Sequence, residues 1–165
     1  KTLIQKLLGN FVTEGREVGP AHRMFPAART VQFNEMEYTV PAEQGLACLE
    51  EVLAVIRKGD FPVFFPVEYR YVAGDDTWLS MYSGRPGASI SVHQYAPQDY
   101  KALFAAVEPV FRKYQGRPHW GKLHTLKAAD LRTVYPRFDD FLAVRRRVDP
   151  QGRLLNDYMK SLLGV

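Results

Sequence analysis

The sequence predicts an α+β domain with the split βαβ, ferredoxin-like arrangement, in which an antiparallel sheet carries helices on one face, plus a helical C-terminal extension. Segments that alternate β-branched or aromatic residues with polar ones are typical of strands. They are interleaved with two long segments whose apolar residues recur at helical spacing. The order is strand, helix, strand, strand, helix, strand. Because crossover connections are right-handed, both helices should cover the same face, with the second and fourth strands at the edges.

The first strand and the first long helix are expected within residues 29–58. Residues 29–40 alternate as a strand does, and Pro41 then begins a helix over residues 42–58. The helix is indicated by an apolar stripe at helical spacing, which consists of Leu46, Leu49, Leu53 and Ile56.

The second half of the pattern follows the same order. Residues 62–73 are expected to form the second strand, and Pro66 places it at an edge because proline cannot donate to a hydrogen-bond ladder. Residues 88–95 are expected to form the third strand and residues 97–114 the second long helix. A short fourth strand fits at residues 116–121.

Three parts of the chain follow from these elements. Residues 1–28 are expected to form an N-terminal helix and arm, residues 29–122 the ferredoxin-like core, and residues 123–165 a helical tail that packs on the core. The chain has 165 residues and begins at Lys1 within an amphipathic pattern. We therefore expect it to be a piece of a longer protein.

Composition excludes several classes of protein. Hydrophobic residues make up 46% of the chain, which is enough for a core and excludes global disorder. The net charge of +4 permits an anionic partner without requiring one. The single cysteine, Cys48, excludes an internal disulfide and fits a buried hydrophobe better than a nucleophile. No long apolar run and no signal peptide occur, so we expect no membrane span and a cytoplasmic location.

The two-residue period of a strand predicts which side chains share a face of the sheet. The helices should cover the face that carries Val67, Tyr69, Ile90 and Val92. The opposite face should then display an acid, a base, two hydroxyls and an imidazole, namely Glu68, Arg70, Ser89, Ser91 and His93. A sheet face exposed to water would also be polar, so a merely solvated face stays open as an alternative.

A second concentration of chemistry lies between Arg117 and His124. It holds two of the four histidines, one of the two tryptophans and a lysine. We expect the end of the fourth strand to deliver Lys122 to the polar face. Each side chain also has a simpler interpretation: Trp120 in the core, His124 as a helix cap, Lys122 on the surface. No set of residues has reliable metal-ligand spacing, and no phosphate-binding loop is present.

The motif His119-Trp120-Gly121-Lys122 resembles the signature of the sugar-lactone and alditol oxidases, which are flavoproteins of the vanillyl-alcohol oxidase class. That group includes the D-arabinono-1,4-lactone, gulonolactone and alditol oxidases. Residues 31–38 resemble the first strand of the family's cap domain, and residues 67–70 resemble its Glu-x-Arg strand. Further segments of the C-terminal tail match in the same order, so the resemblance covers roughly residues 28–165.

The resemblance implies that this chain is the C-terminal cap, or substrate, domain of an oxidoreductase. FAD would be bound mainly by a domain of the same protein that this chain does not contain, so the chain alone should be inactive. The substrate would be a small sugar lactone, alditol or related polyol. It would be oxidised by hydride transfer to FAD, with O₂ or another acceptor reoxidising the flavin.

The resemblance also suggests roles for individual residues. Lys122 and Arg70 would lie near the flavin or the reacting hydroxyl and stabilise negative charge, which makes Lys122 the expected cofactor contact. His93 is the candidate base or hydroxyl ligand.

The remaining candidate residues would contact the substrate. Glu68 would accept hydrogen bonds from substrate hydroxyls and pair with Arg70, and Ser91 is a further candidate. His119 and Trp120 would shape the pocket.

Two other classes of function fit the same fold. Ferredoxin-like sheets with aromatic and basic residues can bind single-stranded RNA, although the predicted polar face carries Glu68 and no RNA-binding motif is present. A module that dimerises through its sheet is the other alternative. We expect no nucleic-acid partner.

Overall fold

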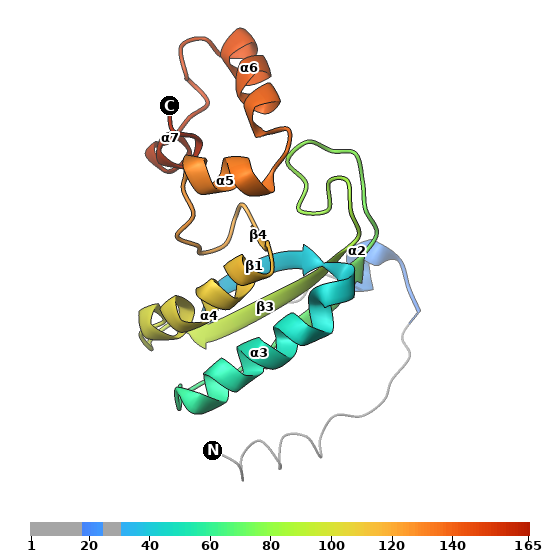
Figure 1. Cartoon of the computed structure of the whole chain (residues 1–165), viewed down its shortest axis with the longest axis vertical. Helices are drawn as coiled ribbons and strands as arrows, with labels where there is room; N and C mark the ends of the chain where they lie inside the picture. The colour runs from blue at the N-terminus through green and yellow to red at the C-terminus, as the bar shows by residue number, and fades with distance from the viewer. Residues whose placement is uncertain (1–17, 25–30) are drawn as a thin grey trace. The chain divides into compact units, whose positions relative to one another are not determined.

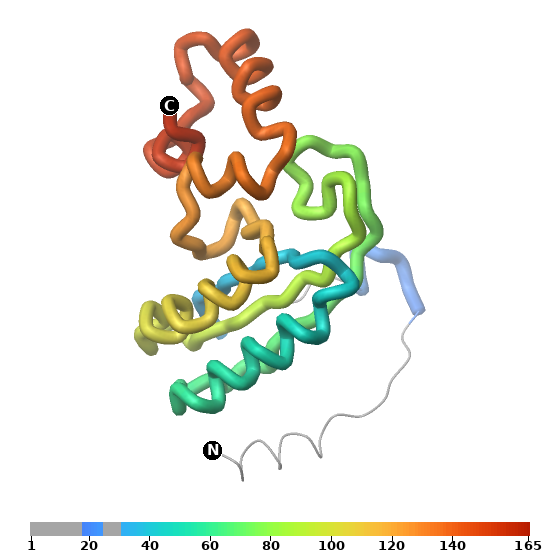
Figure 2. Tube along the Cα trace, viewed as in Figure 1, coloured from blue at the N-terminus to red at the C-terminus, as the bar shows by residue number. Residues whose placement is uncertain are grey.

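A computed structural model of the chain describes residues 18–24 and 31–165. The chain divides into two compact units, residues 1–30 and residues 31–165. In the first unit, the described helix α2 spans Ala21–Met24. The N-terminal helix and arm expected over residues 1–28 otherwise lie outside the described residues. The second unit contains the sheet, both long helices and the C-terminal helices, as the ribbon and the Cα trace show (Figure 1, Figure 2).

The sheet has four strands in the predicted antiparallel arrangement. They are β1 (Phe33–Pro41), β2 (Glu68–Val72), β3 (Gly87–Tyr95) and β4 (Arg117–Pro118). Their spatial order is β2-β3-β1-β4, and every adjacent pair is antiparallel. The second and fourth strands therefore lie at the edges, as the sequence predicts. Strand β1 lies inside the sheet, bonded to β3 on one side and β4 on the other.

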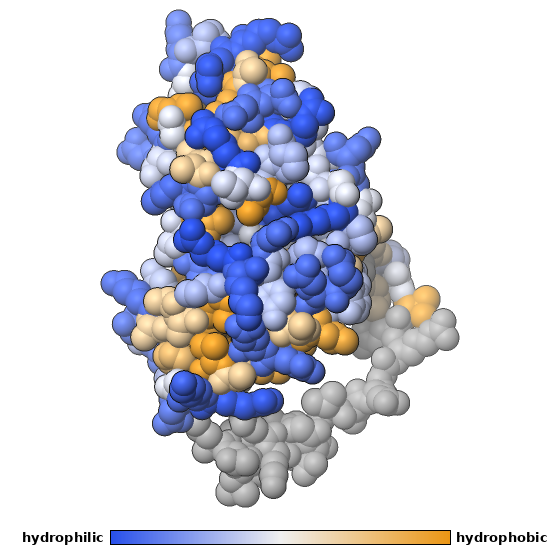
Figure 3. All heavy atoms as spheres, in the orientation of Figure 1, coloured by the Kyte–Doolittle hydropathy of each residue, from blue (hydrophilic) through white to orange (hydrophobic). Residues whose placement is uncertain are grey.

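Both long helices pack on one face of this sheet (Figure 1). Helix α3 spans Gly45–Lys58 after a single 3-10 turn, η1, at Ala42–Gln44. Helix α4 spans Lys101–Lys113 and starts four residues later than expected. A turn closed by Gln98 N–H bonding to the Tyr95 carbonyl precedes it. Figure 3 shows hydrophobic side chains over the region of α3 and α4, with others among the hydrophilic side chains of the C-terminal helices.

The C-terminal extension is helical, as predicted. Helices α5 (Ala128–Val134), α6 (Phe138–Val148) and α7 (Asp157–Leu163) follow one another. Helix α7 begins where the Asn156 side chain accepts a hydrogen bond from the Met159 N–H, the usual N-cap interaction. Buried residues of this extension belong to the same hydrophobic cluster as the sheet.

Two predicted strands are shorter in the structure. The second strand was expected over residues 62–73, but pairing starts at Glu68 because Pro62 and Pro66 have no N–H to donate. The fourth strand was expected over residues 116–121, yet β4 ends at Pro118. The chain turns there, so Lys122 does not lie on a strand.

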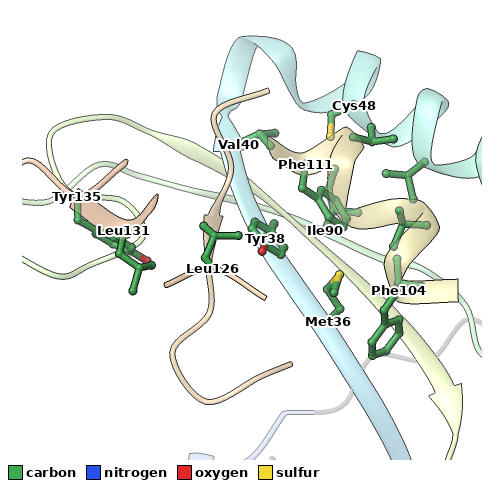
Figure 4. Packing of buried hydrophobic residues seen from close by; sticks show 14 of the residues in the cluster. Met36, Tyr38, Val40, Cys48, Ile90, Phe104, Phe111, Leu126, Leu131 and Tyr135 are labelled. Carbon is green, nitrogen blue, oxygen red and sulfur yellow. The ribbon is translucent and has the colours of Figure 1, made fainter. Parts of the chain in front are cut away.

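The core lies between the sheet and the two long helices (Figure 4). The Tyr38 ring of β1 stacks on Phe111 of α4 with centroids 4.9 Å apart, and its hydroxyl donates to Glu108 over 2.6 Å. Cys48 of α3 is fully buried, as expected for a small hydrophobic side chain, and burial raises the pKa of its thiol to about 12. The core continues beneath the C-terminal helices through Leu126, Leu131, Tyr135, Phe138 and Leu142.

Replacing Phe111 with alanine should remove a fully buried ring from the centre of this core. We expect the free energy of unfolding to fall by about 3–5 kcal/mol, because the surrounding side chains cannot fill the cavity. The measurement is urea unfolding followed by circular dichroism. Leu46→Ala on α3 is the matched control: its side chain is 59% exposed, so its loss should cost less than about 0.5 kcal/mol. Equal losses for the two variants would contradict this assignment of the core.

Candidate functional site

The face of the sheet opposite the helices carries a layer of polar and charged side chains, which we call the polar face. Strand β2 contributes Glu68 and Arg70, and β3 contributes Ser89, Ser91 and His93, as the sequence predicts. The register places Glu68 beside Ser91 and Arg70 beside Ser89.

Sequence reasoning missed two members of the polar face, Glu35 and Glu37 of β1. They lie opposite His93 and Ser91 of β3 in the strand register. Their neighbours Met36 and Tyr38 point into the core. The signal was available, because the alternation that sorted the second and third strands sorts the first strand in the same way.

Lys122 reaches the polar face from a turn, not from the end of a strand. The N–H groups of His119 and Leu123 bond to the carbonyls of Glu37 and Glu35, each over 3.0 Å. The two donors, His119 and Leu123, are four residues apart in the sequence, whereas the two acceptors on β1 are only two residues apart. The extra residues between His119 and Leu123 therefore bulge outward. A hydrogen bond from Lys122 N–H to the His119 carbonyl closes the turn. The fourth strand predicted over residues 116–121 is thus present but limited to Arg117–Pro118, and Lys122 arrives at the polar face from the turn that follows it.

Each cation of the polar face pairs with a carboxylate of β1. The Lys122 ammonium forms an ion pair with Glu35 and lies 3.7 Å from Glu37 Oε2. Arg70 Nη2 lies 2.9 Å from Glu37 Oε1. The predicted pair between Arg70 and Glu68 also exists but is longer, at 3.7 Å, and Glu68 is 47% exposed. Glu35 and Glu37 therefore hold the cations, and Glu68 remains accessible.

His93 is buried beneath this layer and meets it through one nitrogen. Its Nε2 lies 3.3 Å from Glu35 Oε1 and 3.9 Å from Glu68 Oε1. The ring packs edge-on against Phe33, with centroids 5.0 Å apart. Its Nδ1 is buried and has no hydrogen-bond partner among residues 18–24 and 31–165. Any exchange of a proton between His93 and the polar face would therefore pass through Nε2.

The electrostatics of the site centre on Glu35. Burial alone would raise the pKa of this carboxyl group. The hydrogen bond and charge of Lys122 outweigh burial, with further contributions from His93 and Ser91, so the pKa lies below the ordinary value of 4.5. Glu35 is therefore ionised at neutral pH and remains a fixed negative charge beneath Lys122.

The two serines lie within the sheet layer instead of projecting from it. Ser91 is fully buried, and its Oγ lies 3.5 Å from Arg70 Nη2. Ser89 Oγ is hydrogen-bonded to Thr39 Oγ1 over 2.6 Å and to Tyr82 OH over 2.8 Å. In this arrangement the hydroxyls support the charged groups above them.

Two adjoining cavities open beside the polar face, and Lys122 and Trp120 line both. A cavity of about 520 Å³ is bounded by Glu37, Arg70 and His119 and by the 79–82 loop. The other, of about 460 Å³, is bounded by Glu35 and by apolar groups that include Phe33, Leu123 and the ring of Tyr158. Each is of the size of a small-molecule site.

Trp120 lines both cavities, and His119 lines the larger one. The Trp120 Nε1–H donates to the Leu79 carbonyl over 2.8 Å, so its only polar group is already used. The Trp120 ring packs on the Tyr135 ring with centroids 4.9 Å apart. Trp120 is partly buried against the hydrophobic core, so its interpretation as a core residue is partly correct. His119 Nδ1 accepts the Gly121 N–H over 3.0 Å, which keeps its ring at the turn.

Arg117 fixes the scaffold around Trp120. Its guanidinium donates to the carbonyls of Val134, Met81 and Ser83 over 2.7 to 3.3 Å. It thereby ties β4 to the end of α5 and to the 79–83 loop. The Tyr135 hydroxyl adds a bond to the Pro118 carbonyl over 2.9 Å. The C-terminal extension is thus part of what positions the cavity wall.

His124, the last member of the sequence motif, is not part of the polar face. It lines a separate hollow of about 340 Å³ beside Met36 and Phe104. Burial lowers the pKa of its imidazole. Its ring nitrogens have no hydrogen-bond partner within the described part of the chain, so the interpretation as a helix cap is not supported.

Neither a metal site nor a membrane span appears in the described ranges. Within residues 18–24 and 31–165, no three His, Cys, Asp or Glu side chains are grouped so that they could hold a metal ion. No described helix combines the length and apolar character needed to cross a bilayer.

Comparison with known proteins gives consistent matches. The family model for D-arabinono-1,4-lactone oxidase matches residues 1–162. The chain is 42% identical over 161 residues to the L-gulono-1,4-lactone dehydrogenase of Mycobacterium tuberculosis, covering 98% of this chain and 38% of that protein. It is 35% identical over 155 residues to the alditol oxidase of a Streptomyces species, covering 88% of this chain and 36% of that protein. It is 31% identical over 147 residues to the L-gulonolactone oxidase of Bos taurus, covering 86% of this chain and 33% of that protein. The chain therefore spans less than two-fifths of the length of these relatives.

Replacing Glu35 with glutamine should make the stability of the protein less dependent on pH. Because the folded pKa of Glu35 is lowered, its contribution is fully present above pH 4.5 and is lost as the pH falls through the folded value. We expect the difference in unfolding free energy between the parent and Glu35→Gln to be largest near neutral pH and to shrink as the pH falls below 4.5. Urea unfolding at a series of pH values measures it.

The control is Glu50→Gln, which removes an exposed carboxylate of α3. The difference in unfolding free energy between Glu50→Gln and the parent should stay small at every pH. A Glu35→Gln difference that is constant across the same range would show that the ion pairs of Glu35 do not stabilise the fold.

Proposed function

This chain belongs to the D-arabinono-1,4-lactone oxidase family, and we propose that it is the substrate-facing cap domain of a flavin-dependent oxidoreductase. The substrate would be a sugar lactone, an alditol or a related polyol. The proposal rests above all on the polar face, where Lys122 and Arg70 are paired with buried carboxylates beside a cavity of about 520 Å³.

The chemistry of the polar face suits a neutral molecule with many hydroxyl groups. Lys122 and Arg70 can donate hydrogen bonds, and the exposed carboxylate of Glu68 can accept them. The Trp120 ring offers an apolar wall for the carbon skeleton. Three carboxylates face two cations here, counting Glu35 and Glu37. A face without excess positive charge gives little attraction for phosphates, which argues against the nucleic-acid alternative.

The dimerisation alternative is also disfavoured by the polar face. Stable interfaces between identical subunits are more apolar in their buried centre than the surface they come from. Here the centre of the sheet face holds Glu37, Arg70 and Lys122 around a cavity. Covering these groups with a second copy would remove charges from water without an apolar gain.

The residues of the polar face also fit the reactive edge of a flavin. Lys122 is 26% exposed and Arg70 is 50% exposed, so both cationic heads can reach a group placed against the sheet. FAD, when bound, would supply the hydride acceptor for oxidation of a carbinol carbon. Lys122 and Arg70 would stabilise the negative charge that develops at the reacting oxygen. Glu68 would orient neighbouring hydroxyls, and Nε2 of His93 is the atom that would take up the released proton.

We assign the pyrophosphate and adenine contacts of FAD to another domain of the same protein. The sequence contains no glycine-rich phosphate-binding loop. The chain spans 38% of the Mycobacterium tuberculosis relative and 36% of the Streptomyces one, which leaves room for such a domain. On this proposal, the chain by itself would not oxidise a substrate.

Replacing Lys122 with alanine in the full-length enzyme should slow reduction of the flavin by substrate by at least about tenfold, which corresponds to about 1.4 kcal/mol of barrier. The physical reason is the loss of a positive charge aimed at the reacting oxygen. Anaerobic stopped-flow absorbance measures the rate of flavin reduction directly.

The matched control is Lys113→Ala. Lys113 is also an ion-paired lysine, bonded to Glu51, but it lies at the end of α4 and outside both cavities. Its removal should leave the reduction rate unchanged. An unchanged rate in Lys122→Ala, with FAD still bound, would remove Lys122 from the chemistry and with it the main support for the proposed site.

A further inference from the structure

We propose that Glu35 and Glu37 are positioning residues of this site, in that Glu35 fixes the Lys122 ammonium and Glu37 fixes the Arg70 guanidinium. The inference rests on the proposed function, because it assigns these carboxylates a part in the reaction only through the two cations. Neither residue was a candidate from the sequence, and both lie on β1.

The contacts of the four carboxylate oxygens of Glu35 and Glu37 indicate that these residues orient the cations and do not bind the substrate directly. Glu35 directs Oε1 at His93 and Oε2 at Lys122. Glu37 directs Oε1 at Arg70 and Oε2 at Lys122. Every oxygen therefore already faces a cation or an imidazole. The side chains are only 12% and 5% exposed, which leaves little surface for a substrate hydroxyl.

Strand β1 gives these carboxylates a rigid base. It is bonded to β3 along its whole length and to β4 and the 119–123 turn on its other side. The side chains between and beside the glutamates, Met36 and Tyr38, are buried in the core. Two residues along a strand correspond to about 6.5 Å, so the backbone sets the separation of the two negative charges.

The cations need such support because of their length. A lysine or arginine side chain has many rotamers, and it loses that conformational entropy when it is fixed in one orientation. Groups that stabilise a transition state are effective when they are already oriented before the reaction. An ion pair to a buried carboxylate orients the head group in advance. The negative charges also offset the mutual repulsion of Lys122 and Arg70.

The test is a set of double-mutant cycles in the full-length enzyme, read by anaerobic stopped flow as the limiting rate of flavin reduction and the substrate dissociation constant. Glu35→Gln should lower the limiting rate by about 5- to 50-fold and change the dissociation constant by less than about threefold, because it disturbs orientation more than binding. In a Lys122→Ala background, Glu35→Gln should lose most of its effect, since the cation it orients is already absent, and any loss that remains would act through its 3.3 Å contact with His93.

Glu37 supplies the matched comparison. Glu37→Gln should lose most of its effect in an Arg70→Ala background and keep only the part that acts through its longer, 3.7 Å contact with Lys122. Glu35→Gln should keep its full effect there, because Glu35 pairs with Lys122 and His93 and not with Arg70. Glu35→Asp, which keeps the charge, should recover part of the rate lost in Glu35→Gln. If Glu35 acted only through packing, restoring its negative charge in Glu35→Asp would not recover the rate of flavin reduction.

Several outcomes separate the inference from the function on which it rests. If Lys122→Ala and Arg70→Ala leave the reduction rate intact, the proposed site itself fails. If those variants are slow but both glutamine variants reduce flavin at the parental rate, only the positioning role fails. Losses that multiply in every background would show that the glutamates act independently of the cations, which overturns the inference. If Glu35→Gln does not fold, the Glu35→Asp and Glu37→Gln arms decide the question by the same criteria.

Discussion

The two faces of β1 carry different side chains, and the rest of the site depends on that difference. One face sends Met36, Tyr38 and Val40 into the core. The other buries Glu35 and Glu37 against the polar face. Removing two carboxylates from water costs several kcal/mol each unless each finds a cation. Lys122 and Arg70 are those cations. The same ion pairs therefore offset the cost of burying the carboxylates and hold the two cations in place.

Elements far apart in the chain converge on this strand. Arg70 comes from the edge strand β2, and Lys122 comes from the turn that follows the opposite edge strand. The strand β4 just before that turn is held by bonds from Arg117 to the 79–83 loop and from Tyr135 to Pro118, and Trp120 within the turn bonds to Leu79. The extension therefore contributes to the cavity wall without contributing a charged group to the polar face. A substitution in α5 could change the site while lying outside it.

Much of this arrangement can be read from the sequence, and the failures have physical causes. The order of strands and helices, with right-handed crossovers, predicts the strand order, and Pro66 marks an edge strand. Alternation predicts the face that carries Glu68, Arg70 and His93. The fourth strand is overestimated because Pro118 ends its pairing and a turn replaces it, which local pattern does not reveal. The same alternation would have placed Glu35 and Glu37 on the polar face, but no local pattern shows that a lysine from a distant turn pairs with them.

The central claim is that the polar face of this sheet is the surface on which the substrate lies during oxidation. A crystal structure of the full-length enzyme with a bound polyol tests it most directly. The account predicts hydroxyl oxygens of the polyol within hydrogen-bond distance of Lys122, Arg70 and Glu68, with the flavin on the far side of the polyol from the sheet. A polyol bound elsewhere, with the polar face turned away from the flavin, would contradict it.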